Sequence, residues 1–170
     1  MNKIAQFEKV SLNQFINDWI DTFGNRPNHI ITEIYNNLKL PKRATSGSAG
    51  YDFFMPYGFL LKPNESITIP TGIRCKMEEG WVLKMYPRSG HGFKTGVHLS
   101  NTVGIIDADY YKAKNEGHIF IKLVNDSNIA KEINLQDGLG FCQGIFIQFG
   151  ITVDDEAEGE RHGGFGSTNK

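Results

Sequence analysis

The chain has 170 residues, which is enough for one folded domain with a sizeable hydrophobic core. Its formal net charge is −1, so it lacks the basic excess that general nucleic-acid binders carry. No apolar run approaches the roughly 20 residues that cross a bilayer, and the first ten residues lack the apolar core of a signal peptide. We therefore expect a cytoplasmic protein that binds neither nucleic acid nor membrane.

The first forty residues have the pattern of a short strand followed by two helices. Residues 3–10 have the composition of a strand. Apolar residues then recur at spacings of three and four, which predicts an amphipathic helix between Ser11 and Gly24. Ser11 and Gln14 have the spacing of a capping box, and Gly24 suits a helix end. With a second helix at 28–38, we expect a helical hairpin packed on a sheet.

From residue 40 onward, short strands alternate with turns. Turn sequences occur at 62–65, 78–80 and 136–138. Short strands at this spacing, without alternating long helices, favour a mainly β jelly roll or β-barrel. The expected strands are 50–54, 66–71, 73–77, 81–86, 96–99, 118–124, 131–135 and 141–149.

The two cysteines are expected to be buried, reduced thiols. Cys75 and Cys142 each lie in an apolar, strand-like run. They have no CxxC spacing and no histidine cluster near them, so a zinc site is not expected.

The C-terminal end differs in composition from the rest of the chain. Residues 154–160 are acidic and weakly hydrophobic, which predicts an exposed arm. Residues 161–168 are rich in glycine around a single phenylalanine and a single arginine. This composition favours a flap that closes over a ligand, and an unstructured tail is the alternative. We expect one domain over 1–170, with a helical insertion at 11–38 and a linker and flap at 154–170.

Two segments combine a loop or turn of small residues with a charged side chain. Residues 46–52 form a small-residue loop that enters a strand carrying Asp52, although an ordinary turn with an aspartate cap has the same pattern. Residues 86–92 run from a strand end into a glycine-rich turn. Backbone N–H groups in such turns bind anions, and Arg88 and Ser89 add donors suited to phosphate oxygens. The alternative is a surface turn with a salt bridge.

A third segment, 101–110, has residues suited to a nucleoside. We expect its hydrophobic strand to end at Asp107 and a hairpin to follow. Asn101 has the donor and acceptor needed to bind a pyrimidine edge, and Tyr110 can pack on a sugar. Asp107 can act as a general base toward a water. The alternative is an Asx turn with a core tyrosine.

A fourth segment, 140–146, has Gln143 as the polar exception in an apolar strand. Its amide is either satisfied within the core or faces a cleft. The residue alone leaves both interpretations open.

Taken together, the four segments and the tail resemble the five ordered motifs of the trimeric dUTP pyrophosphatase (dUTPase) family. Each motif is weak alone, but five in this order are specific, and they span nearly all of residues 40–168. The first forty-five residues also resemble a subgroup found in Firmicutes and their phages. The matching positions are 49–52, 87–90, 104–110, Gln143, and 163–168 with Arg161.

This resemblance implies a jelly-roll protomer in a homotrimer, with active sites shared between chains, that cleaves dUTP to dUMP and pyrophosphate. Asp107 would be the general base for in-line attack of water on the α-phosphorus, and Gln143 would help order that water. Mg²⁺ would be held mainly by the triphosphate, with Asp52 as an outer-shell partner.

The resemblance also implies the substrate contacts. Asn101 and the backbone at Gly104 would bind uracil, and Tyr110 would pack on deoxyribose and exclude a ribose hydroxyl. The phosphates would be held by Arg88, Ser89 and Gly90. In the tail, Phe165 would stack over uracil beside Gly166, and the β- and γ-phosphates would be clamped by Arg161, Ser167 and Thr168.

The chain departs from the family pattern in several places. The gap between Arg161 and Phe165 is one residue shorter than in many members, and the chain ends without the common final glycine. The fourth motif usually begins with arginine, but residues 139–140 are Leu and Gly, and the turn of the third motif is lengthened at 111–117.

Two rival functions remain at this stage. A dCTP deaminase shares the scaffold, but it needs a second serine and a catalytic glutamate where this chain has Gly90 and Asp107. A catalytically silent nucleotide sensor or phage repressor-binding module is the other. A bacterial or phage regulatory partner would be expected at 11–38 or 111–117.

Overall fold

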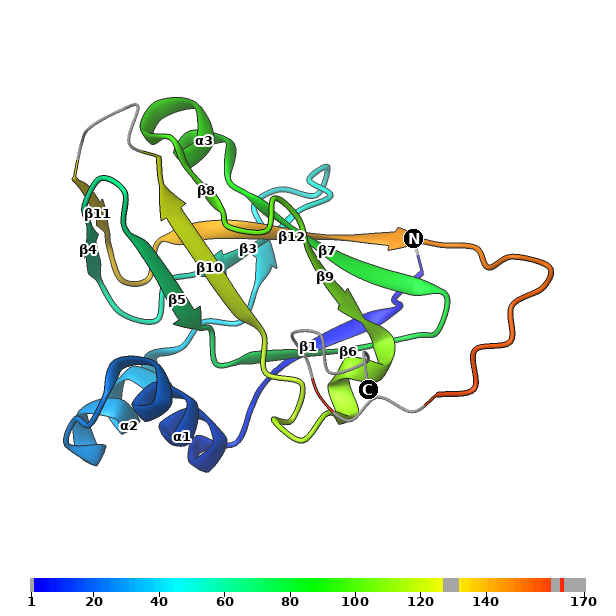
Figure 1. The fold of residues 1–170 in the computed structure, drawn as a ribbon, viewed down its shortest axis with the longest axis horizontal. Helices are drawn as coiled ribbons and strands as arrows, with labels where there is room; N and C mark the ends of the chain where they lie inside the picture. Colours follow the sequence, from blue (N-terminus) through cyan, green and yellow to red (C-terminus); the bar gives the residue numbers. More distant parts are fainter. Residues whose placement is uncertain (1, 127–131, 160–162, 164–170) are drawn as a thin grey trace.

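The computed structural model describes residues 2–126, 132–159 and 163, and it is built mainly of β-strands (Figure 1). The strands are β1 (Ala5–Lys9), β2 (Lys42–Arg43), β3 (Tyr51–Phe54), β4 (Phe59–Leu61), β5 (Ser66–Pro70), β6 (Ile73–Met77), β7 (Trp81–Pro87), β8 (Val97–Leu99), β9 (Gly104–Asp107), β10 (Phe120–Asn125), β11 (Ile133–Leu135) and β12 (Gly140–Gln148). The helices are α1 (Leu12–Phe23), α2 (Asn28–Asn37), α3 (Ser89–Thr95) and a 3₁₀ helix, η1 (Ala108–Lys112).

Within the described residues the strands form four antiparallel sheets in a jelly-roll-like arrangement. The largest has the order β2-β3-β12-β7-β9, and a second has the order β5-β10-β8. β1 pairs with β6, and β4 pairs with β11. β12 is the long central strand of the largest sheet, so the segments on β3 and β7 lie on its two sides.

Two hydrophobic clusters hold the fold together. One lies between the sheets and contains Phe53, Leu83 and Phe141, each almost completely buried. The other lies under the helical pair, where Phe15 and Trp19 of α1 and Ile31 of α2 have no exposed surface. Figure 1 shows α1 and α2 side by side at the edge of the β-structure, next to β5. The expected helical hairpin is confirmed, and its apolar stripe is the face that is buried.

The ends of α1 confirm half of the expected capping box. The hydroxyl of Ser11 accepts from the N–H of Gln14 at 3.1 Å, and the N–H of Gly24 donates to the carbonyl of Ile20 at 2.8 Å. The side chain of Gln14, however, does not return to Ser11 and donates to Asp18 instead. The N–H of Ser11 donates to a carboxylate far along the chain, that of Glu116, at 2.7 Å.

The expected strands from residue 50 onward are confirmed with shifts of one or two residues at the described ends. β2 and β4 were missed because two or three residues are too short to show alternation. Residue 131, where one strand was expected to start, is outside the described residues.

Two local expectations were wrong. The glycine-rich turn after Arg88 is the short helix α3, which ends at Gly96 in the left-handed conformation. No hairpin follows Asp107, because β9 pairs with β7 whereas β10 pairs with β5 and β8. η1 and the lengthened turn instead lead the chain from one sheet to the other.

Both cysteines are buried and free of disulfides. Burial raises the pKa of the Cys75 thiol to about 12 and that of Cys142 well above its usual range. No helix in the described ranges is long and apolar enough to span a membrane.

Replacing Gly72 by alanine is expected to destabilise the fold more than the same change at Gly80. Both have positive φ, +73° and +81°, so both substitutions carry the left-handed strain of about 1–2 kcal/mol. A Cβ at Gly72 would also lie 2.2 Å from Leu38 and 3.3 Å from Phe15, whereas nothing lies within 4 Å at Gly80. Crowding of this kind adds about 1–3 kcal/mol. Urea unfolding of the two variants measures the difference, and equal midpoints would contradict it.

Candidate functional site

A cavity of about 430 Å³ lies where β8, β9, β10 and η1 meet. Asn101, Gly104 and Tyr110, three of the positions expected to contact a nucleoside, all line it. The remainder of the wall is largely apolar, with polar groups from Ser100 and Lys122. A mostly apolar hollow with a few convergent polar groups is the usual form of a small-molecule site.

Local backbone geometry fixes the polar edge of this cavity. After β8 the N–H of Thr102 donates to the carbonyl of Leu99 at 3.0 Å, and Thr102 has φ of 64°. This tight turn holds Asn101 at the entrance of β9. A Cβ at Gly104 would lie 3.1 Å from Met85, so glycine lets β9 approach β7 closely beside Asn101.

Tyr110 contributes its ring to the cavity wall. The side chain is 6% exposed, and its hydroxyl donates to the carbonyl of His118 at 2.8 Å. The side-chain amide of Asn115 donates to the same hydroxyl at 2.8 Å. Because the hydroxyl is bound on the side of the following turn, the ring is the part available to a ligand.

A second hollow, of about 550 Å³, contains the residues expected to bind phosphate. It is lined by Arg88 and Ser89 at the end of β7 and by Gln143 of β12. Antiparallel pairing brings them together, since Gln143 lies opposite Tyr86 on one side and opposite Asp52 on the other. Gly90 lies in the first turn of α3 and is exposed.

The guanidinium of Arg88 is held in place by two contacts. Its Nε lies 3.1 Å from Oδ1 of Asp52, and its Nη1 donates to the carbonyl of Gly140 at 3.1 Å. Asp52 was expected as an outer-shell magnesium partner, and the structure places its carboxylate against Arg88. The two contacts use part of the five N–H donors of an arginine and orient the others.

The sequence left open whether the amide of Gln143 is satisfied within the protein or faces a cleft, and the structure shows features of both. It lines the hollow and is half-buried, and its amide also donates to the carbonyl of Pro87 at 3.3 Å. A Cβ at Gly50 would lie 2.5 Å from the amide oxygen of Gln143. The loop before β3 therefore packs directly against this side chain.

Asp107 lies at the far end of the sheet from Arg88. It ends β9 and pairs with Val82, near the start of β7, whereas Arg88 directly follows the end of β7. Six residues of extended strand span about 20 Å. Asp107 is half-buried and belongs to neither hollow, although its neighbour Ile106 lines the first. One protomer therefore does not bring the expected base and the expected phosphate ligand together.

Five further site positions, Arg161, Phe165, Gly166, Ser167 and Thr168, lie outside the described residues. Several residues that line the hollows were not expected from the sequence, among them Phe93 and Lys122. Phe93, 92% exposed on α3, lies beside Arg88, and Lys122 of β10 faces the first cavity. The alternation of Lys122 with the buried Ile121 and Leu123 was the signal that pointed to an outward lysine.

The first cavity has an amide at its edge, and the second hollow contains an oriented guanidinium. Together, on a jelly-roll-like scaffold, they suit a protein that binds a nucleotide. The chain belongs to the dUTPase family, because the family model described as dUTPase matches residues 36–169.

Individual relatives agree with this assignment. The deoxyuridine 5'-triphosphate nucleotidohydrolase of Lactococcus lactis is 41% identical over 143 residues, covering 82% of this chain and 94% of that protein. Among solved structures, the dUTPase of Streptococcus mutans is 37% identical with a TM-score of 0.62, covering 71% of this chain and 91% of that one. The dUTPase of Staphylococcus bacteriophage 80alpha has a TM-score of 0.61 at 20% identity and covers 92% of this chain and 97% of that one, which shows similarity of fold alone.

Replacing Gly50 by alanine is expected to disturb the second hollow with little loss of stability. The new Cβ would push the flexible end of Gln143 out of its place and away from Pro87. Gly47→Ala is the matched control, since nothing lies within 4 Å of its added Cβ. Pyrophosphate release from dUTP should fall clearly for Gly50→Ala and remain normal for Gly47→Ala, with similar melting temperatures. Equal activity of both variants would argue against a role for the Gln143 orientation.

Proposed function

We propose that this protein hydrolyses dUTP to dUMP and pyrophosphate, which limits uracil incorporation into DNA and supplies dUMP. The observation that carries the proposal is that Asn101, Gly104 and Tyr110 line one cavity, because Gly104 and Tyr110 belong to the segment that resembles the third motif of the family and Asn101 lies three residues before it. The names of the relatives support the same reaction.

The cavity suits a deoxyuridine. The amide of Asn101 and the backbone at Gly104 offer the donors and acceptors that a uracil edge requires, and cytosine would leave some of them unpaired. Buried polar groups left unpaired give strong discrimination. The ring of Tyr110 would pack on the deoxyribose, and a ribose hydroxyl would meet this wall.

The second hollow suits the phosphates. Arg88, with its guanidinium oriented by Asp52 and Gly140, would donate to phosphate oxygens together with Ser89 and Gly90. Hydrolysis of a phosphoanhydride needs mainly positioning and neutralisation of charge. Asp107 would deprotonate the attacking water, and Gln143 would help order the site.

The residues of the tail would complete the site. Phe165 with Gly166 would cover the base, and the β- and γ-phosphates would be bound by Arg161, Ser167 and Thr168. These roles rest on the resemblance of their sequence to the fifth family motif. Closing such a segment over the substrate would exclude water from the reacting phosphate.

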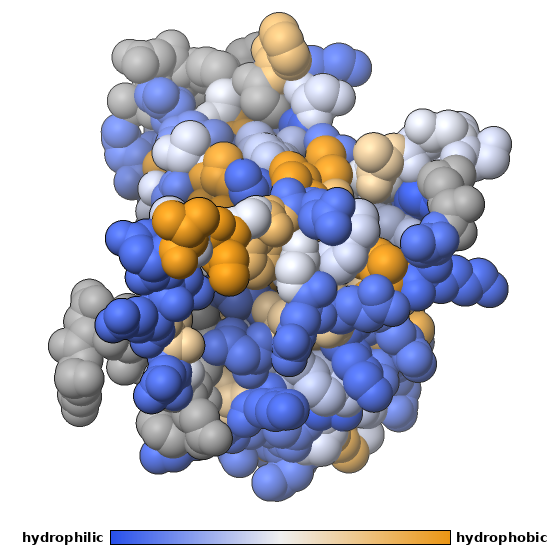
Figure 2. All heavy atoms as spheres, turned by 90° about the vertical axis from the view of Figure 1, so that its right-hand side faces the viewer, coloured by the Kyte–Doolittle hydropathy of each residue, from blue (hydrophilic) through white to orange (hydrophobic). Residues whose placement is uncertain are grey.

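The site is proposed to be shared between the chains of a homotrimer. The separation of about 20 Å along β7 between the backbones of Asp107 and Arg88 supports this, because both residues would have to lie beside the same triphosphate. Apolar residues that follow β12, Phe149, Ile151 and Val153, are strongly exposed. Figure 2 shows the side of the molecule toward which β12 and the following arm extend, where apolar side chains gather among hydrophilic ones. Exposed apolar groups of this kind suit contact with another subunit.

Mg²⁺ is proposed as the cofactor, carried mainly by the substrate. The described part of the chain has no group of three or more His, Cys, Asp or Glu placed to hold a metal. Mg²⁺ usually keeps several of its waters and is bound by substrate phosphates with one or two carboxylates, so it does not require such a group. Asp52 would contact it through water. When bound, Mg²⁺ neutralises the charge of the triphosphate.

Three finer assignments belong to the same proposal. The protein is assigned to the cytoplasm and to the subgroup of Firmicutes and their phages. The Lactococcus relative supports the assignment to this subgroup. The whole chain is proposed to form one domain.

A pyrophosphate-release assay with Mg²⁺ across dUTP, dTTP, UTP and dCTP tests the reaction. Rapid release from dUTP with little from the other three is expected. Release of ammonia from dCTP would indicate a deaminase instead, and binding of dUTP without turnover would indicate a silent sensor.

Asp107→Asn is expected to retain affinity for dUTP and to lose turnover. The amide preserves the shape of the side chain but cannot accept the proton of the water, and general-base catalysis commonly contributes about 10²–10⁴-fold. Calorimetry with a non-hydrolysable dUTP analogue measures binding, and single-turnover kinetics measures the chemical step. A variant as fast as the wild type would remove Asp107 from the role of base.

Mixing two inactive variants tests the sharing of sites. When Asp107→Asn and Arg88→Ala chains assemble at random in equal amounts, about a quarter of the sites would combine an intact Asp107 with an intact Arg88 from another chain. Each variant alone is expected to be inactive, and the mixture should recover about a quarter of the wild-type rate. If the mixture is as inactive as its components, both residues act within one protomer.

A further inference from the structure

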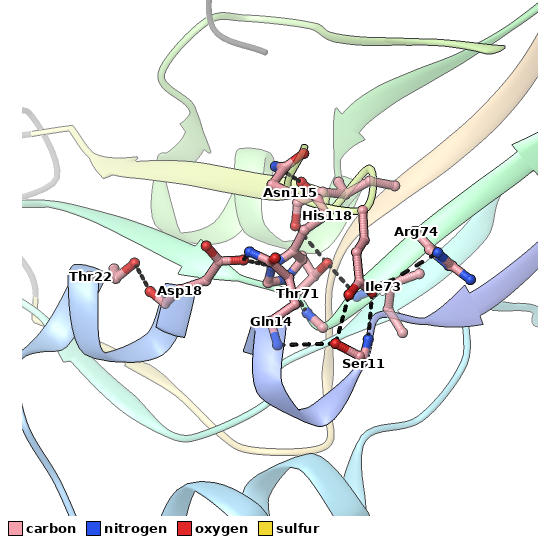
Figure 3. Close-up of polar contacts among 12 residues, drawn as sticks. Ser11, Gln14, Asp18, Thr22, Thr71, Ile73, Arg74, Asn115 and His118 are labelled. Atoms are coloured by element: carbon pink, nitrogen blue, oxygen red, sulfur yellow. Dashed lines mark hydrogen bonds and ion pairs between the residues drawn. The ribbon is translucent and has the colours of Figure 1, made fainter. Parts of the chain in front are cut away.

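The helical insertion is bound to the lengthened turn that follows η1 (Figure 3). Both carboxylate oxygens of Glu116 accept from Ser11, one from its N–H at 2.7 Å and the other from its hydroxyl at 2.7 Å. Burial alone would raise the pKa of Glu116, but the hydrogen bonds from Ser11 and the nearby charge of Arg74 lower it overall. The start of α1 and the end of this turn are thus joined by an ionised carboxylate.

A second contact, between α1 and the residue that directly follows this turn, is buried. His118 has no exposed surface, and its Nδ1 contacts the carboxylate of Asp18 on α1. Its Nε2 accepts from the N–H of Gly72 at 2.7 Å. Since Nε2 accepts, the proton of the neutral ring is on Nδ1 and is donated to Asp18. Gln14 donates to the same carboxylate oxygen at 2.9 Å and helps fix its position.

His118 also contacts the wall of the first cavity. Its carbonyl accepts from the hydroxyl of Tyr110, and its ring lies 4.6 Å from the ring of Phe120, centroid to centroid. Tyr110 and Phe120 both line the cavity. On its other side the ring of His118 faces Phe15 of α1 at 6.2 Å. A continuous path of hydrogen bonds and ring contacts therefore runs from α1 to two residues of the pocket.

We propose that Asp18 and His118 are positioning residues that hold Tyr110 and Phe120 in place, so that the helical insertion helps set the fit of the pocket to the sugar. The inference rests on the proposed function, since it assigns the sugar to this wall. Neither residue touches the substrate. Asp18 fixes the ring of His118, and His118 fixes the tyrosine hydroxyl and the phenylalanine ring.

Removal of the Asp18 carboxylate would leave the Nδ1–H of His118 buried without its partner. The ring would shift or rotate to find another acceptor, and its carbonyl and the ring of Phe120 would move with it. A small displacement of a wall that rejects one hydroxyl group changes selectivity, because that rejection depends on close contact.

The experiment compares the full-length wild type with Asp18→Ala, Asp18→Asn and Asp21→Ala. In Asp18→Asn the amide oxygen can still accept from Nδ1–H, so this variant should rescue the defect. Asp21 lies exposed on the same helix, and Asp21→Ala removes the same charge as a matched control. Steady-state rates with dUTP and with UTP, calorimetric binding of dUMP and UMP, and melting temperatures are measured for each.

For Asp18→Ala we expect KM for dUTP to rise about fivefold to tenfold, with kcat within about twofold, and the preference for dUTP over UTP to fall about tenfold. Asp18→Asn should recover most of the preference, and Asp21→Ala should match the wild type. A lower melting temperature for Asp18→Ala with unchanged KM and preference would overturn the inference, because the pair would then only stabilise the fold.

Two further outcomes are distinguishable. If Asp18→Ala does not fold, Glu116→Gln, which weakens the more exposed contact to Ser11, should show the same loss of preference to a smaller degree, and a normal preference would contradict the proposal. If the wild type does not hydrolyse dUTP, the proposed function fails. The ratio of the affinities for dUMP and UMP then tests the inference by itself. A smaller ratio in Asp18→Ala than in the wild type supports the inference. An equal ratio in the two proteins, or no preference for dUMP in the wild type, overturns it.

Discussion

The antiparallel pairing of β12 with β3 on one side and β7 on the other is the constraint on which the rest of the site depends. It places Gln143 between Asp52 and Tyr86, and it brings Asp52 close enough to bind Arg88 at 3.1 Å. Asp52, Arg88 and Gln143, which are far apart in the sequence, become neighbours through this strand pairing. A slip of one residue in this register would turn the side chain of Gln143 to the opposite face of the sheet. Its amide would then no longer line the second hollow.

The same rigid sheet also separates groups that act together in the proposed reaction. β7 runs from the neighbourhood of Asp107 to Arg88, so its length keeps the base and the phosphate ligand about 20 Å apart within a chain. Strands do not bend to close such a gap. This separation is the reason for proposing that the site is shared between chains, and the exposed apolar residues after β12 would offer a surface for such contact.

The helical insertion has a hydrophobic and a polar role. Phe15, Trp19 and Ile31 give it a core of its own, which accounts for its packing on β5. The contacts of α1 with Glu116 and His118 are polar and directional, and hydrogen bonds of this kind fix position more strictly than apolar packing does. The lengthened turn of the third motif and the insertion are thus matched parts, since the carboxylate of one and the hydroxyl of the other satisfy each other.

The sequence alone determined the features that depend on neighbouring residues. Periodicity predicted the helical pair and most of the strands from residue 50 onward, although it missed β4, and the motifs grouped Asn101, Gly104 and Tyr110, which line one cavity. Tertiary structure decided the partners. The N–H of Ser11 donates to Glu116 and not to Gln14, and β9 pairs with β7 and not with β10. Asp18 binds His118, a histidine that belongs to no sequence motif. Periodicity and local turns are encoded over a few residues, whereas a donor pairs with the acceptor that the folded chain brings within reach, and that acceptor can lie a hundred or more residues away in the sequence.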